Sequence, residues 1–312
     1  MKAYLVGALP RPDTLIKTYR DFAKKRISPD VLRRELEKVS RMYVEVQEKA
    51  GLAYVLEGML AWNDLLRPFA SSLENVEING LFRWFDNNFF YKIPSVFGRI
   101  GLKDEFDRSV FFHHLIDERK RKIVLPEPYC FARLAENRFY ERFDEFVMDV
   151  ADALAEFVKR VGPFAQIQMS SPSLVFEEVS LSELEISKKA VEAFKSKTKR
   201  ELFLHLPFGS SARTLGFLRD FDVDVLGIDL YKTSVEALRG LEMDKALYVG
   251  LVDGRNTLLE DVADVVSMLR TVEKITRVKE IHFGPNCELE HLPSEHALKK
   301  LGLLGDVLRE VG

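Results

Sequence analysis

Short apolar runs recur along this chain between longer amphipathic stretches, and this alternation is the sequence feature that most limits its fold. Several runs are apolar at consecutive positions, which is typical of parallel strands that are buried on both faces. Strands that alternate with helices in this way predict an α/β fold with a parallel sheet. The eight runs span residues 3–8, 53–57, 123–125, 164–169, 202–206, 223–228, 246–252 and 280–283.

The intervals between the runs carry helix signals. Ser28 and Pro29 form an N-cap and first-turn pair, apolar residues then recur at three-to-four spacing, and Gly51 marks an end. Eight strands alternating with helices predict a single (β/α)8 TIM barrel over residues 1–312. A doubly wound open sheet is the alternative, but no G-x-G-x-x-G turn follows the first run. The other helical patterns cover residues 144–160, 182–196, 212–221, 235–240, 259–276 and 295–311.

The interval from Trp62 to Lys122 is too long for one barrel connection. It contains the aromatic, β-prone segment LFRWFDNNFFYKIP at residues 81–94. We expect this segment to form a hairpin-like insertion between strands 2 and 3 that covers the barrel as a lid. Its rings offer flat faces to a heteroaromatic ligand, and they also suit plain packing against the barrel.

Charge and cysteine content limit the classes of partner. The 46 basic and 49 acidic residues give a net charge of -3, so there is no overall basic field to hold nucleic acid or an anionic membrane. We therefore expect a small-molecule substrate. No apolar run approaches the ~18 residues of a membrane span, and two cysteines are too few for a disulfide framework. These features favour the cytoplasm.

In a (β/α)8 barrel the loops after the strands meet at one end, so polar residues just beyond the strands are the site candidates. The turn VDGRN places Arg255 where it would grip a carboxylate or phosphate, or else form a structural ion pair. The residues that we expect to contact a ligand or an interface are Arg11, Trp62, Asp64, Trp84, Asp86, Asn88, Asp253, Arg255 and Asn256.

Metal ligation is a second possibility for this end. Cys287 would ligate zinc together with His205 and a carboxylate such as Asp229, although a buried histidine or cysteine is also a common structural residue. His282, Cys287 and His291 form another local group, but their five- and four-residue spacings match no strong zinc pattern. No residue is assigned a catalytic role from the sequence.

Five segments together resemble the cobalamin-independent methionine synthase family, whose two face-to-face (β/α)8 barrels move a methyl group from a folate to homocysteine. The signatures with W-F-D and V-D-G-R-N resemble the N-terminal barrel, and the resemblance covers nearly the whole chain. The segments are VGALPRP, MLAWNDLLRP, LFRWFDNNFFYKIP, VGLVDGRN and GPNCELEHLP.

The resemblance also bears on the metal. In the family's C-terminal barrel, zinc is held by a His-x-Cys pair, a Glu and a distant Cys. His205, Asp229 and Cys287 match three of these positions, whereas Pro207 stands at the pair's cysteine and has no side-chain donor. Ser170 and Ser171 stand at the family's acidic fourth-strand positions. The zinc set implied by the resemblance is therefore incomplete in this chain.

Three functions remain open at this point. The resemblance implies a donor-binding or accessory barrel that works with a separate zinc-bearing catalytic barrel to methylate homocysteine. A complete zinc-dependent homocysteine S-methyltransferase is the first alternative. A non-catalytic barrel that binds a pterin or a corrinoid, or that has a regulatory role, is the second. The methyl donor expected from the resemblance is a methyl-folate, another methyl-pterin or a methyl-corrinoid.

Overall fold

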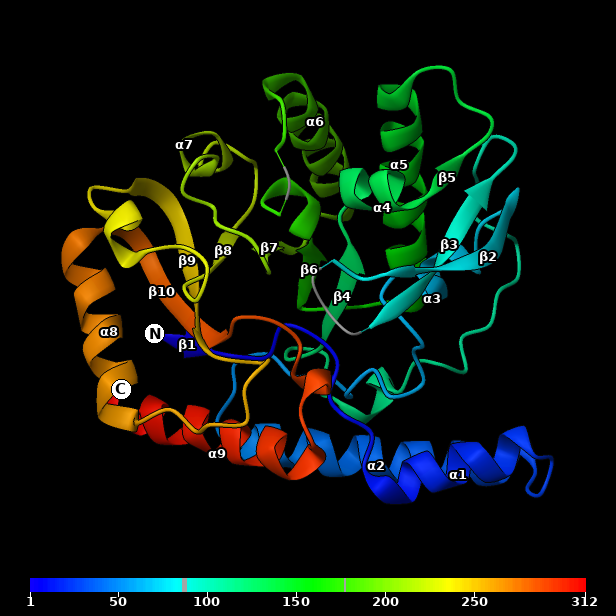
Figure 1. The fold of residues 1–312 in the computed structure, drawn as a ribbon, viewed down its shortest axis with the longest axis horizontal. Helices are drawn as coiled ribbons and strands as arrows, with labels where there is room; N and C mark the ends of the chain where they lie inside the picture. The colour runs from blue at the N-terminus through cyan, green and yellow to red at the C-terminus, as the bar shows by residue number, and fades with distance from the viewer. Residues whose placement is uncertain (86–88, 177) are drawn as a thin grey trace.

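The computed structural model describes residues 1–85, 89–176 and 178–312. Within these ranges, seven parallel strands form a curled sheet in the order β1-β10-β9-β8-β7-β6-β4 (Figure 1). The mixed α/β class and the parallel sheet predicted from the sequence are confirmed. The strands are β1 (Lys2–Ala3), β4 (Lys122–Pro126), β6 (Gln166–Ser170), β7 (Glu201–Leu206), β8 (Val225–Asp229), β9 (Glu242–Val252) and β10 (Arg277–Pro285).

The first and the last strand of the chain are neighbours in this sheet. β1 pairs with β10 in parallel, with Lys2 beside His282. Isolated parallel bridges join Tyr4 to Tyr54 and Val55 to Arg121. The apolar run 53–57 thus contacts the segments next to β1 and β4, although it makes single bridges rather than a named strand.

Helices cover the outside of the sheet (Figure 1). The long helices α2 and α9 lie side by side, and Gly305 of α9 approaches the backbone of Ala50 just after α2. Within the described ranges, no helix is both long and apolar enough to cross a membrane. The α-helices are α1 (Asp13–Ala23), α2 (Pro29–Lys49), α3 (Arg67–Ala70), α4 (Pro128–Leu134), α5 (Phe143–Val161), α6 (Leu181–Thr198), α7 (Leu215–Leu218), α8 (Val262–Ile275) and α9 (Ser294–Val311).

Two of the expected helices are much shorter than the sequence pattern indicates. The stretch 212–221 contains only the four-residue α7, and glycine at position 216 weakens any longer helix there. The stretch 235–240 is a 3-10 helix, η3 (Val235–Leu238), which Gly240 follows with a φ of 75°. Two other helices, α1 and α4, form where the sequence pattern predicts no helix.

The aromatic segment forms a hairpin with part of the preceding chain. β2 (Val76–Arg83) and β3 (Phe90–Val96) pair antiparallel, and β5 (Glu136–Asn137) pairs with β3 in parallel. This small sheet lies beside the parallel sheet near α3 and α4 (Figure 1). Asp86 and Asn88 lie outside the described residues.

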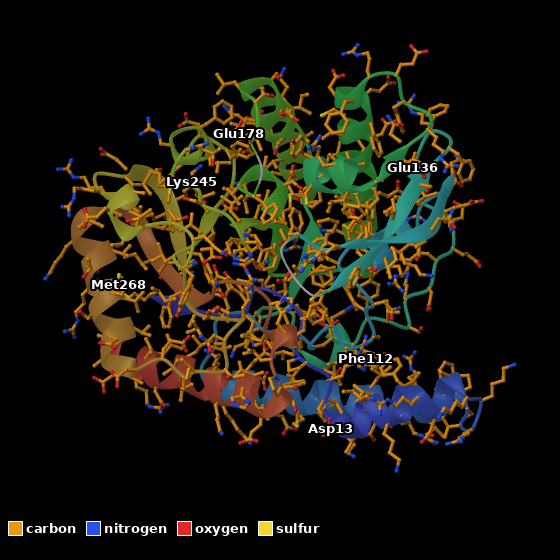
Figure 2. The ribbon with its side chains drawn as sticks, viewed as in Figure 1. Asp13, Phe112, Glu136, Glu178, Lys245 and Met268 are labelled. Atoms are coloured by element: carbon orange, nitrogen blue, oxygen red, sulfur yellow. The ribbon has the colours of Figure 1, made fainter. Side chains whose placement is uncertain are left out.

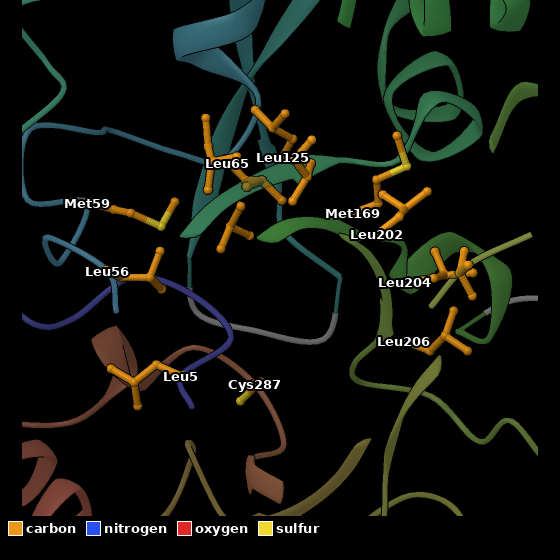
Figure 3. Packing of buried hydrophobic residues seen from close by; sticks show 14 of the residues in the cluster. Leu5, Leu56, Met59, Leu65, Leu125, Met169, Leu202, Leu204, Leu206 and Cys287 are labelled. Atoms are coloured by element: carbon orange, nitrogen blue, oxygen red, sulfur yellow. The ribbon is translucent and has the colours of Figure 1, made fainter. Parts of the chain in front are cut away.

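Side chains pack densely between the sheet and the helices around it (Figure 2), and those at alternating strand positions belong to different buried clusters. Leu202, Leu204 and Leu206 point outward into the large core beneath the helices (Figure 3). Phe203 between them belongs instead to a separate inner cluster with Tyr248. This two-residue alternation follows from the strand's pleat.

Candidate functional site

Polar side chains meet where the parallel strands end. Glu57 follows the bridge at Val55, Glu127 follows β4, Asp229 ends β8 and Glu288 follows β10. All four carboxyl groups are buried. Buried ionisable groups at the carboxyl ends of parallel strands are typical of a functional site in an α/β protein.

Asp229 ties three of the loops together. Its Oδ1 accepts hydrogen bonds from the Tyr231 amide at 2.9 Å and the Asn286 side chain at 3.2 Å, and its Oδ2 accepts from the Phe208 amide at 3.3 Å. Burial raises the pKa of Asp229 to about 6, although these hydrogen bonds oppose the shift. The carboxylate is therefore engaged by the loops after β7, β8 and β10.

His205 and Cys287 are buried on either side of this centre. Burial, and then the Lys122 ammonium, lower the pKa of His205 to about 3, and neither of its ring nitrogens has a hydrogen-bond partner. Burial raises the pKa of the Cys287 thiol, which belongs to the large apolar core drawn in part in Figure 3. His205 and Asp229 do not join Cys287 in a compact ligand cluster among the described residues. Zinc on these three residues remains a prediction.

A different trio is brought together at the end of β10. One ligand atom from each of Cys287, Glu288 and His291 lies within 4.8 Å of the other two. Burial raises the pKa of Glu288 to about 8 and lowers that of His291 to about 4. His282 is elsewhere, with its Nδ1 2.8 Å from the hydroxyl of Tyr4. Sequence spacing singled out two of the three clustered residues and missed Glu288, whose three-residue spacing to His291 was the available signal.

Arg11 and Trp62 line a cavity of about 530 Å³ at the same end. Arg11 donates from Nε to the Leu60 carbonyl at 2.8 Å and from Nη2 to the Trp62 carbonyl at 2.5 Å. The indole Nε1 of Trp62 is buried and has no acceptor. A buried N–H without a partner is costly to the fold.

Asp64 has a structural role at the start of α3. Its Oδ1 accepts from the amides of Leu66 and Arg67 at 3.1 and 2.8 Å, and its Oδ2 accepts from both Nε and Nη2 of Arg67. These contacts use both carboxylate oxygens. Asp64 therefore supports the loop after Trp62 rather than facing the cavity as a free group.

The tip of the β2–β3 hairpin rests on the loops at the strand ends. Phe85 lies 5.2 Å from Phe176 and 6.3 Å from Phe208 between ring centroids, and Phe89 lies 4.4 Å from His291. Trp84 is buried against Phe85 and donates its backbone N–H to the Phe89 carbonyl. The aromatic segment thus covers part of the site.

The loop after β9 is held in place by its own polar groups. Asp253 Oδ1 accepts from the Arg255 amide at 2.9 Å, and Asn256 Oδ1 accepts from the Leu258 amide at 3.0 Å. Glu260 accepts from the Asp253 amide at 2.7 Å. Arg255 is exposed and close enough to lower the pKa of His291. This loop brings Asp253, Arg255 and Asn256 to the same end as the clustered trio.

One cavity had no signal in the sequence analysis. It measures about 750 Å³ and lies between the loops after β6 and β7, with Phe176, Phe208, Arg213 and Lys232 in its wall. Glu290 was also missed: burial raises its pKa to about 7. The lining residues come from loops whose paths no periodic pattern describes.

Glu57 predicts a pH dependence of folding. Burial raises its pKa to about 7, so between pH ~4.5 and ~7 the folded state keeps a proton that the unfolded chain has lost. We expect Glu57 to lower the free energy of unfolding by roughly 1–3 kcal/mol as pH rises through this window. Glu57→Gln has no such proton and should show a flatter profile in denaturant titrations. Identical pH profiles for the two proteins would contradict this assignment.

Comparison with known proteins identifies relatives of this arrangement. The family model described as "Cobalamin-independent synthase, N-terminal domain" matches residues 68–277. A methionine synthase of Saccharolobus solfataricus is 24% identical over 307 residues, which cover 95% of this chain and 90% of the relative. A 5-methyltetrahydropteroyltriglutamate–homocysteine methyltransferase of Bacillus cereus is also 24% identical, over 89% of this chain but only 41% of the longer relative.

Solved structures agree on the fold. A B12-independent methionine synthase from Shewanella superposes with a TM-score of 0.76 at 18% identity, covering 99% of this chain and 98% of the other. A putative vitamin-B12-independent methionine synthase from Listeria monocytogenes gives 0.77 at 15% identity, with 100% and 99% covered. With a family model matched over residues 68–277, the chain belongs to the cobalamin-independent methionine synthase family and matches its N-terminal domain.

Proposed function

We propose that this chain takes part in methyl transfer to homocysteine as a donor-binding or accessory barrel that works with a separate zinc-bearing catalytic barrel. The observation that carries the proposal is the cavity lined by Arg11 and Trp62 beneath Phe89, at the end where the strands finish. It offers a buried N–H donor, an aromatic edge and a nearby cation. Pro207, in place of a ligating cysteine, argues against the family's full zinc set in this chain.

The proposal includes a complete (β/α)8 barrel as one domain over residues 1–312. Segment 53–57 would be its second strand, since Tyr54 bridges to Tyr4 on one side and Val55 bridges to Arg121 on the other. The β2–β3 hairpin would then be an insertion between strands 2 and 3. A closed barrel explains why the polar residues of distant loops face one opening.

An exposed aromatic surface supports the proposed partner. Leu81, Phe82 and Phe90 of the hairpin are 63%, 59% and 51% exposed, and Phe97 just beyond it is 51% exposed. Exposed apolar side chains that cluster on one element are typical of a protein interface. The hairpin also reaches the cavity through Phe89, so a barrel docked there would lie next to the bound donor.

The residues of this chain would position the methyl donor. Arg11 holds the carbonyls of Leu60 and Trp62, which fixes the loop that carries the Trp62 indole into the cavity wall. Holding the methyl donor in line with an acceptor thiol recovers much of the entropy cost of a two-molecule reaction. Zinc, when bound by the partner, supplies a reactive thiolate at neutral pH.

Donor binding to Trp62→Phe tests the cavity. The variant keeps an aromatic ring and removes the unpaired N–H, so we expect the dissociation constant of the donor to rise about fivefold, as for one lost hydrogen bond. Calorimetric titrations with a methyl-folate, another methyl-pterin and a methyl-corrinoid measure it. Arg119→Ala, at an exposed arginine that does not line the cavity, is the control. Unchanged binding in Trp62→Phe would remove the cavity from the proposal.

A reconstitution assay tests the division of labour. The purified chain alone should form no methionine, and addition of a zinc-bearing catalytic barrel of this family should give methyl transfer that depends on both proteins. Methionine formed by the chain alone would favour a complete zinc-dependent homocysteine S-methyltransferase. Donor binding without transfer in either mixture would favour a non-catalytic pterin- or corrinoid-binding barrel.

A further inference from the structure

We infer that Cys287, Glu288 and His291 form a binding site for a zinc-like divalent cation, distinct from the set of His205, Asp229 and Cys287. Thiolate sulfur, carboxylate oxygen and imidazole nitrogen are the three donor types that zinc accepts in proteins. The three candidate ligand atoms lie within 4.8 Å of one another. A small contraction would bring them to the spacing of ligands around one ion with bonds of about 2.0–2.3 Å.

Two of the three donors are buried and have no partner. Neither Glu288 Oε2 nor His291 Nε2 has a hydrogen-bond partner, and the Glu288 residue is only 7% exposed. The Cys287 thiol makes a single long contact of 3.7 Å to the carbonyl of Glu288. A buried polar atom without a partner is costly. A cation bound here would be a partner for both of these atoms and for the neighbouring Cys287 thiol.

Glycines at positions 254 and 7 leave room for the side chains of Cys287 and Glu288. A Cβ at Gly254 would lie 2.8 Å from the Cys287 sulfur, and a Cβ at Gly7 would lie 2.3 Å from Cγ of Glu288. Any other residue at either position would displace a donor. The 3-10 helix η4 (Leu289–His291) then turns the chain so that His291 returns toward Cys287.

The charge of the cluster also suits a divalent cation. A thiolate and a carboxylate together neutralise the two positive charges, so the loaded site can stay buried. Three protein ligands leave one tetrahedral position for water or another ligand. The ring of Phe89, centred 4.4 Å from that of His291, covers the site. The cation site does not depend on the proposed methyl transfer.

Metal binding to the purified full chain tests the site. The protein is stripped with a chelator, dialysed against zinc and assayed for metal, and cobalt is then used as a probe for thiolate-to-metal charge-transfer absorption. We expect one zinc per chain and a cobalt–thiolate band. Cys287→Ala and His291→Ala should each weaken zinc binding about 100-fold, because each removes one of only three protein ligands.

Matched variants separate this site from its alternatives. Cys130→Ala removes the chain's other buried cysteine, and His205→Ala removes the histidine of the alternative set; both should bind zinc as the parent does. Circular dichroism confirms folding, and Glu288→Gln, nearly equal in shape, replaces any variant that does not fold. Absence of zinc from the parent chain, or loss in His205→Ala with retention in His291→Ala, would overturn the inference. Neither outcome would change the expected result of the Trp62→Phe titration.

Discussion

Glu127→Ala is expected to lower the free energy of unfolding by roughly 3–5 kcal/mol, because one buried carboxylate satisfies four donors. It accepts hydrogen bonds from the amides of Tyr129 and Cys130, at 3.0 and 2.9 Å, where α4 begins. It also accepts from the hydroxyls of Ser171 and Ser187, at 2.9 and 3.0 Å. Alanine would leave these donors buried without partners. Urea titration followed by circular dichroism measures the loss.

Asp261→Ala is the matched control for this prediction. Asp261 caps α8 in the same way, accepting from the amides of Ala263 and Asp264, but it is exposed to solvent. Water replaces the lost acceptor there, so we expect a loss of only about 1 kcal/mol. Equal losses in the two variants would mean that helix capping alone, and not the buried network of Glu127, accounts for the effect.

Lys300→Met is expected to lower the free energy of unfolding by roughly 3–5 kcal/mol, because it leaves the Glu260 carboxylate poorly compensated in a largely buried place. The Lys300 side chain is 1% exposed and that of Glu260 is 14% exposed. The Lys300 ammonium donates to both Glu260 oxygens, at 2.8 and 2.9 Å, and to the Leu258 carbonyl at 2.7 Å. The loss is measured by denaturant titration, as for Glu127.

A double-mutant cycle isolates the ion pair. Lys300→Met combined with Glu260→Gln removes both charges, so the double variant should be more stable than the sum of the single losses predicts, by about 0.5–3 kcal/mol. Hydrogen exchange at the Asp253 amide, which donates to Glu260, reports on the loop itself. Strictly additive losses with unchanged exchange would show that the pair does not hold this loop.

The sequence pattern located most of the parallel sheet because each buried strand depends on a short local run. Ile123, Ile167 and Leu202 belong to such runs and lie in adjacent strands, paired in register. The helix over residues 29–49 could also be predicted from the sequence, since its apolar stripe buries Leu36 and Tyr43. α4 could not be found in this way, because its first turn depends on a capping carboxylate and on contacts with distant segments rather than on periodicity.

Only some residues of the candidate site could be predicted from the sequence. Arg11 and Trp62 line one cavity, and their contact with a ligand stays a prediction. The role of Asp64 as the partner of Arg67 depends on how the loop folds back. The sequence signals for Glu288 were only its position beside Cys287 and its three-residue spacing to His291. Its importance comes from burial without a partner, which is a property of the assembled loops and not of local spacing.

The pairing of β1 with β10 has a consequence for synthesis on the ribosome. Lys2 finds its sheet partner only at His282, and translation at about 5–20 residues per second places these two residues roughly 14–56 seconds apart. During that time the first strand of the nascent chain has an unpaired edge where β10 will later dock. Chaperones that shield such edges would therefore act mainly on the N-terminal segment, before the last strand emerges.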